Sequence, residues 1–359
     1  MKFFCNGLDM VDAVSKVSKA VSFKDKSSIL SGIKIDAYEN KIKFFATDGE
    51  LSIEKIIEGE VFSEGEIIVP AKYLLDLIKK LEKQDVSVTL TQKNEIKLVY
   101  GDSEANLQLF DAQKFPKFEI KEESESFEMK GIDFCELISS SQYCASSDDT
   151  RPLYKGILLE LSKDKVTAVA LDGFRMAIIN KSSIGKDKKS LVVPAKSLVE
   201  ICRFVRPMDN IEIFYDANNI MVKIDGAKII SRTYSGEFLK YENILPQTSE
   251  ISVVIDTKMF AEGLERVAVM LENINSKMVK FEFSNQDNSL TMLSNSEIGS
   301  IREKIPCKIS GSDLVIAFNA RYFADVAKTI SDEFIKLYFN NASSPCIVTE
   351  KKIKVYTNI

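Results

Sequence analysis

The sequence has 359 residues, of which 45% are hydrophobic and 28% charged, and its formal net charge is −5. This composition is typical of a folded globular protein, and it excludes a disordered chain and one that wraps in nucleic acid through overall basicity. The sequence contains no histidine, so the commonest general base and the commonest metal ligand are absent.

The sequence also indicates where in the cell the protein is expected. No apolar run approaches the ~18 residues that a membrane helix needs. The first residues do not resemble a signal peptide, because Asp9 and Asp12 interrupt the apolar stretch early. Six cysteines are scattered without a C-x-x-C pair. We therefore expect a cytoplasmic protein with reduced thiols and no membrane partner.

The predicted elements repeat along the chain, with each third containing two halves in which a helix precedes period-2 strands. The first helix of each third is expected near residues 8–21, 132–145 and 258–271. Strands alternate apolar and polar residues, as in residues 33–38 and 165–172, and are bounded by Asn, Asp and Gly turns. Short helices combined with antiparallel strands predict an α+β fold.

The second helix of each third opens on a repeated motif. Val-Pro-Ala-Lys occurs at residues 69–72 and 193–196, and Phe-Asn-Ala-Arg occurs at residues 318–321. The motif alanines are therefore 124 and 125 positions apart. Together with linkers near residues 122–125 and 247–250, this period predicts three domains, at 1–122, 123–248 and 249–359.

Each motif helix carries a basic residue, a carboxylate and a basic residue at positions i, i+4 and i+7, which lie on one helix face. The three sets are Lys72, Asp76 and Lys79; Lys196, Glu200 and Arg203; Arg321, Asp325 and Lys328. Two interpretations are open: charges that solvate an outer face, or a cationic surface for phosphate backbones. Threefold repetition at one register favours the second.

Motifs for catalysis are lacking. The sequence has no phosphate-binding G-x-x-x-x-G-K-[ST] loop and no G-x-G-x-x-G fingerprint. Residues 146–149, Ser-Ser-Asp-Asp, could be imagined as a metal corner, but a polar loop is the favoured interpretation. We expect no enzyme activity from this chain alone, and no cofactor. A third class of function, a hydrolase that uses carboxylates, would predict metal-dependent turnover, and nothing in the sequence calls for it.

The motifs together resemble the bacterial DNA polymerase III beta subunit family, the DNA sliding clamps. The resemblance covers all three thirds and rests on Thr-Asp-Gly at 47–49, the three helix motifs, and the runs at 148–152, 171–177, 236–246 and 343–346. It implies the DNA clamp fold: three similar domains, each with two helices packed on antiparallel sheet. Two chains would join head to tail in a six-domain ring around duplex DNA.

The resemblance also implies function and partners. The protein would be a non-catalytic processivity factor, an accessory subunit of a DNA-directed DNA polymerase. Its partners would be double-stranded DNA without sequence preference, a second copy of the chain, the DNA polymerase III alpha subunit, the clamp loader and other proteins with clamp-binding motifs. Two alternatives are a divergent clamp paralogue with altered partners and an oligomeric scaffold that does not bind DNA.

Site residues follow from the same resemblance. The DNA-facing residues would be Lys24, Lys72, Lys79, Lys83, Arg151, Lys196, Arg203, Arg206, Arg321 and Lys328. The dimer interface would join Ala105, Leu107 and Leu109 to Val269 and Met270. Ala105 replaces a common aromatic residue, so we expect this interface to be weaker or differently packed.

A surface pocket for short apolar partner peptides is the third implied site. Its matching positions are Tyr154, Leu171, Gly173, Phe174, Arg175, Met176, Leu239, Ile244, Ser343, Val355 and Tyr356. Three departures from the family pattern concern its specificity: Leu171 replaces the usual Thr, Leu239 the usual Pro, and residues 355–359 replace a Met-Pro-Met-Arg-like segment. We expect the pocket itself, with an altered peptide preference.

Overall fold

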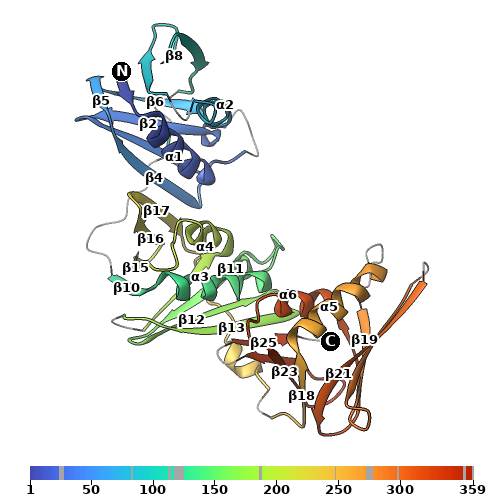
Figure 1. Cartoon of the computed structure of the whole chain (residues 1–359). Helices are drawn as coiled ribbons and strands as arrows, with labels where there is room; N and C mark the ends of the chain where they lie inside the picture. The colour runs from blue at the N-terminus through green and yellow to red at the C-terminus, as the bar shows by residue number, and fades with distance from the viewer. Residues whose placement is uncertain are drawn as a thin grey trace. The chain divides into compact units, whose positions relative to one another are not determined.

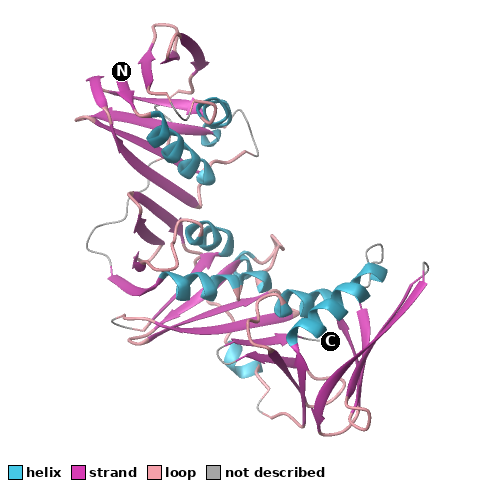
Figure 2. Ribbon diagram, in the orientation of Figure 1, coloured by secondary structure: helices cyan, strands magenta, loops and turns pink. Residues whose placement is uncertain are grey.

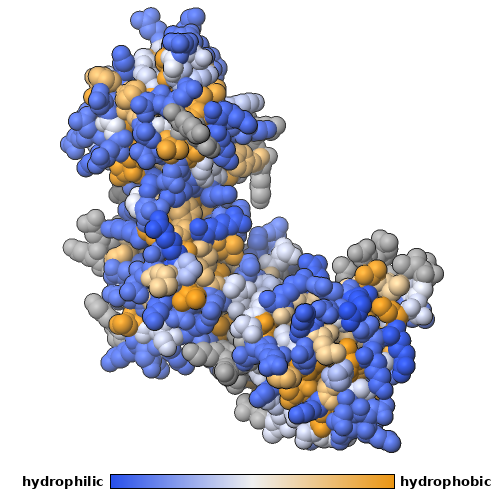
Figure 3. Space-filling view, in the orientation of Figure 1, coloured by the Kyte–Doolittle hydropathy of each residue, from blue (hydrophilic) through white to orange (hydrophobic). Residues whose placement is uncertain are grey.

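The computed structural model describes residues 1–23, 28–81, 84–111, 115–116, 125–185, 188–246, 248–271, 278–296, 299–350 and 353–357. It divides into two compact units (Figures 1 and 2). Unit 1 comprises Met1–Gly131 and Lys196–Thr233, and unit 2 comprises Ile132–Ala195 and Tyr234–Ile359. Hydrophilic residues dominate the surface visible in Figure 3, and the apolar residues are mostly buried.

Unit 1 contains two antiparallel sheets. The eight-stranded sheet has the order β10 (Glu125–Lys130), β15 (Asn210–Tyr215), β16 (Asn219–Ile224), β17 (Ala227–Arg232), β4 (Leu51–Glu58), β3 (Lys41–Thr47), β2 (Gly32–Tyr38) and β6 (Gly65–Pro70). The five-stranded sheet has the order β5 (Glu60–Ser63), β1 (Lys2–Cys5), β7 (Val86–Leu90), β8 (Glu95–Tyr100) and β9 (Ser103–Gln108).

Helices α1 (Gly7–Val17) and α2 (Ala71–Ile78) belong to unit 1 and contact each other. The side chain of Asn6 caps α1 by accepting a hydrogen bond from the Leu8 amide at 2.9 Å. Met10 and Val14 lie on the buried face of α1, which packs on β4. The amphipathic spacing in the sequence thus becomes one layer of helices on a sheet.

The first and second thirds of the sequence join through one strand pair of unit 1. Strands β17 and β4 pair antiparallel, with Ala227 opposite Lys55. The adjacent turn contains Asp225. Its carboxylate accepts a hydrogen bond from Lys16 Nζ at 2.5 Å, and its backbone carbonyl accepts one from Lys55 Nζ. The pKa of Asp225 is lowered, chiefly by the hydrogen bond from Lys16. This charged cluster therefore reinforces the sheet pairing at neutral pH.

Unit 2 is built on one twelve-stranded antiparallel sheet. Its order is β14 (Lys189–Pro194), β11 (Gly156–Leu161), β12 (Lys165–Leu171), β13 (Arg175–Ser182), β25 (Ile353–Thr357), β24 (Cys346–Glu350), β23 (Phe334–Phe339), β18 (Ile251–Asp256), β21 (Gly299–Ser310), β20 (Ser289–Ser296), β19 (Met278–Ser284) and β22 (Leu314–Asn319). The pair β13–β25 joins the second third of the sequence to the last.

Helices α5 (Thr257–Ala268) and α6 (Ala320–Ala327) pack together in unit 2. Beneath them lies a cluster of phenylalanine rings with centroids 5.0–6.3 Å apart, mostly tilted or edge-to-face. Its members are Phe260, Phe281, Phe283, Phe318, Phe323 and Phe339. Two further helices, α3 (Gly131–Ser139) and α4 (Ala195–Cys202), start at the boundaries between the units.

The repeat predicted from the sequence is confirmed by the helix starts. Ala71, Ala195 and Ala320 are the first residues of α2, α4 and α6. The apolar faces of these helices are largely buried, and the six lysines and arginines of their predicted stripes are exposed. The predicted α+β fold of paired helices on antiparallel sheet is therefore confirmed. No helix in the described ranges has the length and apolar content needed to cross a bilayer.

The Asp-Gly turns also repeat in geometry. Gly49 and Gly173 both have φ of +96°, a conformation that favours glycine. Each preceding aspartate caps the turn: Asp48 accepts from the Leu51 amide at 2.8 Å, and Asp172 accepts from the Arg175 amide at 3.0 Å. The third copy, at residues 295–296, ends β20 immediately before undescribed residues.

The cysteines give a first prediction. The six cysteines are not joined in disulfides, and Cys5, Cys144, Cys307 and Cys346 are buried. Burial raises the pKa of Cys5 to about 12 and that of Cys307 to about 11. At pH 8 we expect these four thiols to react with an aromatic disulfide reagent at least about a hundredfold more slowly than in denatured protein. Rapid reaction of more than the two half-buried thiols in the native chain would contradict this expectation.

Candidate functional site

A pocket opens in unit 2 at one end of the β12–β13 hairpin. Its volume is about 130 Å³. The hairpin turn, the segment 239–246, the residue before β24 and strand β25 all contribute to its wall. The lining residues are Leu171, Gly173, Phe174, Arg175, Met176, Leu239, Ile244, Pro246, Pro345 and Tyr356.

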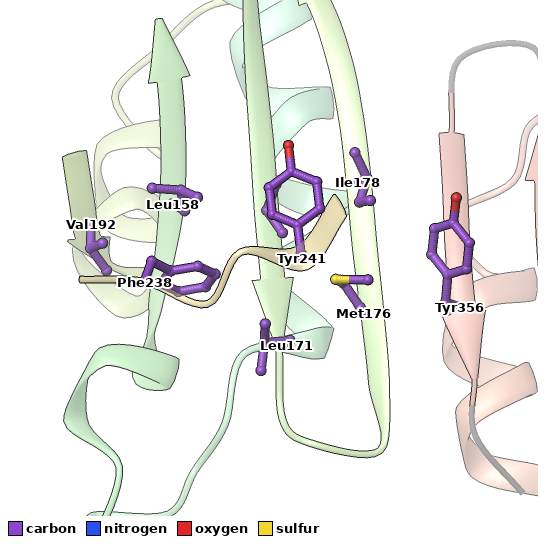
Figure 4. Close-up of a cluster of buried hydrophobic side chains, with 9 residues drawn as sticks. Leu158, Leu171, Met176, Ile178, Val192, Phe238, Tyr241 and Tyr356 are labelled. Carbon is purple, nitrogen blue, oxygen red and sulfur yellow. The ribbon is translucent and has the colours of Figure 1, made fainter. Parts of the chain in front are cut away.

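The floor of the pocket belongs to a buried hydrophobic cluster (Figure 4). Leu171 and Met176 face each other across the hairpin and are 4% and 5% exposed. At the rim, in contrast, Phe174 is 60% exposed and Ile244 is 58% exposed. A buried apolar floor under an exposed apolar rim is suited to binding apolar side chains of a ligand.

Arg175 is the one cation among the described lining residues of the pocket, and its side chain is only 9% exposed. Its guanidinium donates to Asp172 Oδ2 at 3.0 Å, to Asp325 Oδ2 on α6 at 2.7 Å and to the carbonyl of Tyr143 at 2.6 Å. It also lies over the ring of Tyr322 at 4.5 Å. Despite its burial, the pKa of Arg175 is raised by its carboxylate partners. Arg175 thus ties the pocket to helix α6.

Most of the residues predicted for a peptide pocket come together here. Eight of the eleven line it, whereas Tyr154, Ser343 and Val355 are placed elsewhere. Tyr154 packs against the floor cluster, with its ring 5.8 Å from that of Phe238. Val355 is fully buried and Ser343 is exposed. The prediction omitted Pro246 and Pro345, although both lie in the sequence runs that carried the resemblance.

The predicted DNA-facing residues that the structure describes are all exposed. Lys24 and Lys83 lie outside the described residues. Lys72 and Lys79 are on or just after α2, Lys196 and Arg203 on or just after α4, and Arg321 and Lys328 on or just after α6. Arg206 follows α4, and Arg151 precedes a 3-10 turn at Pro152–Lys155.

Some of these cations have carboxylate partners. Arg203 pairs with Glu200 at 2.8 Å, Arg206 with Asp225 at 3.4 Å, and Lys196 with Asp48 at 3.9 Å. Within the described part of the chain, the remaining five have no ion pair closer than 4.0 Å; they are Lys72, Lys79, Arg151, Arg321 and Lys328. The exposed cations are therefore available to an anionic ligand, since such surface pairs are weak.

The repeated carboxylates have different roles. Asp76 is exposed, and Asp325 binds Arg175. Glu200 forms an ion pair with Arg203, just after the same helix. Sequence periodicity placed Asp325 in a surface stripe and missed its contact with the pocket. Only the three-dimensional structure, in which the Arg175 side chain reaches Asp325 on α6, reveals this contact.

The polar loop at residues 146–149 is explained by local hydrogen bonds. Asp148 accepts from the Thr150 amide at 2.9 Å and from its hydroxyl at 2.7 Å. These bonds lower the pKa of Asp148, with the backbone bond as the largest cause. Asp149 forms an ion pair with Lys155. Both carboxylates thus have partners within the next six residues of the chain, as is typical of a polar turn.

The predicted interface residues lie at an edge and at a helix end. Strand β9 is the last strand of its sheet, and Ala105, Leu107 and the following Leu109 are half-buried. Val269 is 56% exposed and Met270 is half-buried, directly after α5. An edge strand with apolar residues is a template for pairing with another chain.

Two helices on antiparallel sheet, repeated three times with the same motif at the start of each second helix, define a three-domain clamp fold. Family models of the DNA polymerase III beta subunit match the sequence throughout: the N-terminal domain at residues 1–119, the central domain at 128–240 and the C-terminal domain at 242–358. The chain belongs to the DNA polymerase III beta subunit family.

Individual relatives agree with this assignment. The beta sliding clamp of Staphylococcus aureus is 26% identical over 346 residues, which cover 93% of this chain and 91% of the relative. A putative DNA polymerase III beta subunit from Eubacterium rectale matches the structure with a TM-score of 0.94 and 27% identity, over 100% of this chain and 99% of that one. The DNA polymerase sliding clamp of Bacillus subtilis has the same fold, with a TM-score of 0.94 at 24% identity, over 100% and 98% of the two chains.

Proposed function

We propose that this protein is a DNA sliding clamp, a cytoplasmic processivity factor that encircles duplex DNA and tethers a replicative polymerase to it. The observation that carries the proposal is the threefold repeat of exposed cations at one register of α2, α4 and α6. The family assignment and the relatives named as sliding clamps support it. In this role the chain is an accessory subunit without catalysis of its own.

The cations would act on the phosphate backbone. Lysine and arginine side chains that meet phosphates release counterions, which gives affinity without sequence preference and makes it fall with salt. Persistence on DNA would then come from the closed ring, since a duplex cannot leave a ring without a free end. Weak contacts inside the ring are compatible with sliding.

The ring would consist of two chains joined head to tail, with three domains from each. We place the domains at 1–122, 123–248 and 249–359, close to the three family-model matches. The joint would pair the free edge of β9 with the surface near Val269 of a second chain. A head-to-tail interface of this kind gives a closed ring when the rotation that relates one chain to the next, applied twice, completes a full turn. The small side chain of Ala105 supports a looser joint than an aromatic residue would give.

The pocket beside the β12–β13 turn would hold apolar side chains of partner peptides. Its buried floor and exposed rim support this use. The partners we propose are the DNA polymerase III alpha subunit, the clamp loader and other proteins with clamp-binding motifs. The loader would supply the nucleotide-driven opening for which this sequence has no motif.

A loading experiment tests the ring. We expect sedimentation to give the mass of two chains, and a clamp loader to leave labelled protein on nicked circular DNA. After linearisation of the same DNA, the protein should slide off, because the ring then meets an open end. A monomeric mass, or equal retention on circular and linear DNA, would contradict the proposal.

A further inference from the structure

A second hollow lies on the same face of the β14–β11–β12–β13 sheet as the pocket. Its volume is about 580 Å³. The two hollows share Tyr356, and Ile244 of the pocket is followed in sequence by Leu245 of the second hollow. We call this second hollow the lysine groove, after Lys165, Lys188 and Lys189 in its lining.

The strand register explains how the pocket leads into the groove. Because successive same-face residues are two positions apart, the paired strands present consecutive rows of side chains. The rows are Leu171 and Met176; then Val192, Leu158, Val169 and Ile178; then Ser190, Glu160, Thr167 and Asn180. The surface thus changes from an apolar floor at the pocket to polar groups in the groove.

Polar groups in the third row are ordered by hydrogen bonds. Thr167 Oγ1 donates to Asn180 Oδ1 at 2.8 Å. Tyr241 donates its hydroxyl to Glu160 Oε2 at 2.6 Å, and burial together with this bond raises the pKa of the phenol. In Figure 4 the hydroxyls of Tyr241 and Tyr356 point the same way, away from Leu171. The polar ends of both rings are therefore at the groove side of the cluster.

Beyond the third row the groove becomes basic. Lys165 on β12 is two positions beyond Thr167, and Lys188, the residue directly before β14, is two positions beyond Ser190. Both are exposed, as is Lys189, and none of the three has an ion pair within the described residues. Glu160 is held by Tyr241, and Glu242 is the other carboxylate in the lining. Three free cations outnumber two carboxylates, so the groove favours a negatively charged ligand.

We propose that the lysine groove binds an acidic segment directly adjoining the apolar anchor of a partner peptide. This inference rests on the proposed use of the pocket by such peptides. The path from Leu171 to Thr167 is four residues of strand, roughly 13 Å, which about four extended residues of a peptide also span. A peptide with an apolar anchor and an acidic flank therefore matches the order of the rows. The lysines discriminate among partners that fill the pocket equally well.

Fluorescence anisotropy with a standard clamp-binding peptide tests the proposal. Versions carry four glutamates at the N-terminal or the C-terminal end, and serine-flanked versions control for length. We expect one glutamate-flanked peptide to bind about five- to tenfold more tightly than its serine counterpart at low salt, with the advantage lost near 0.5 M salt. The variant Lys165→Glu/Lys188→Glu should remove this advantage and leave the unflanked peptide within about twofold of wild type.

A matched variant separates local from overall charge. Lys308→Glu/Lys336→Glu makes the same change in net charge on the same unit, at two exposed positions opposite Val254. It should leave the advantage of the acidic flank intact. Equal affinity for glutamate- and serine-flanked peptides at both ends would overturn the lysine groove alone. Failure of wild-type protein to bind even the unflanked peptide would overturn the pocket as well.

Discussion

Replacing Arg175 by alanine is expected to destabilise unit 2 by roughly 3 kcal/mol, because the substitution leaves two half-buried carboxylates without their partner. Asp172 and Asp325 are 17% and 25% exposed, and both bind the guanidinium. The substitution also removes the donor to the Tyr143 carbonyl and the cation over Tyr322. Helix α6 should lose its tie to the pocket.

Hydrogen exchange on the full chain locates this effect. We expect amides of α6 to exchange faster in Arg175→Ala, whereas those of α2, in unit 1, keep their protection. Arg175→Lys tests the geometry, because lysine keeps the charge and lacks the planar fork that binds two carboxylates at once. Phe174→Ala is the matched control, since this side chain is 60% exposed on the rim. If α6 amides exchanged at the wild-type rate in Arg175→Ala, the ion pairs of Arg175 would contribute little to the stability of α6.

The local features of the fold were predictable because local signals specify them. Apolar spacing and the repeated motif located α2, α4 and α6, and Asp-Gly pairs located two turns with the same φ. Eight of the ten described lining residues of the pocket followed from motif resemblance. Neither spacing nor motif showed that β4 pairs with β17 or β13 with β25, because such pairing depends on contacts between distant segments. The lysine groove depends on the same long-range register, and no sequence motif marks it.

The basic stripes lead to the prediction with the largest functional effect. Reversing one cation per motif helix, in Lys79→Glu/Arg203→Glu/Lys328→Glu, should lower the amount of protein retained on nicked circular DNA by at least about tenfold. Three positions per chain become six in a two-chain ring. If all six meet phosphates, the dependence of log affinity on log salt should become shallower by about 5. The measurement is binding to short duplexes over a salt series, together with retention on the circle.

The interpretation depends on charge position, so the control must carry the same charge. Lys41→Glu/Lys163→Glu/Lys336→Glu reverses three exposed lysines on or beside strands, one in each proposed domain. It should load and slide as wild type does, because screened charges distant from DNA contribute little to its binding. Reversal at Arg203 also places a second carboxylate near Glu200, so Arg203→Gln serves to show that this repulsion is not the cause. If the helix variant and the strand variant were retained equally on circular DNA, the cations of α2, α4 and α6 would not face the duplex, and an oligomeric scaffold would explain their exposure better.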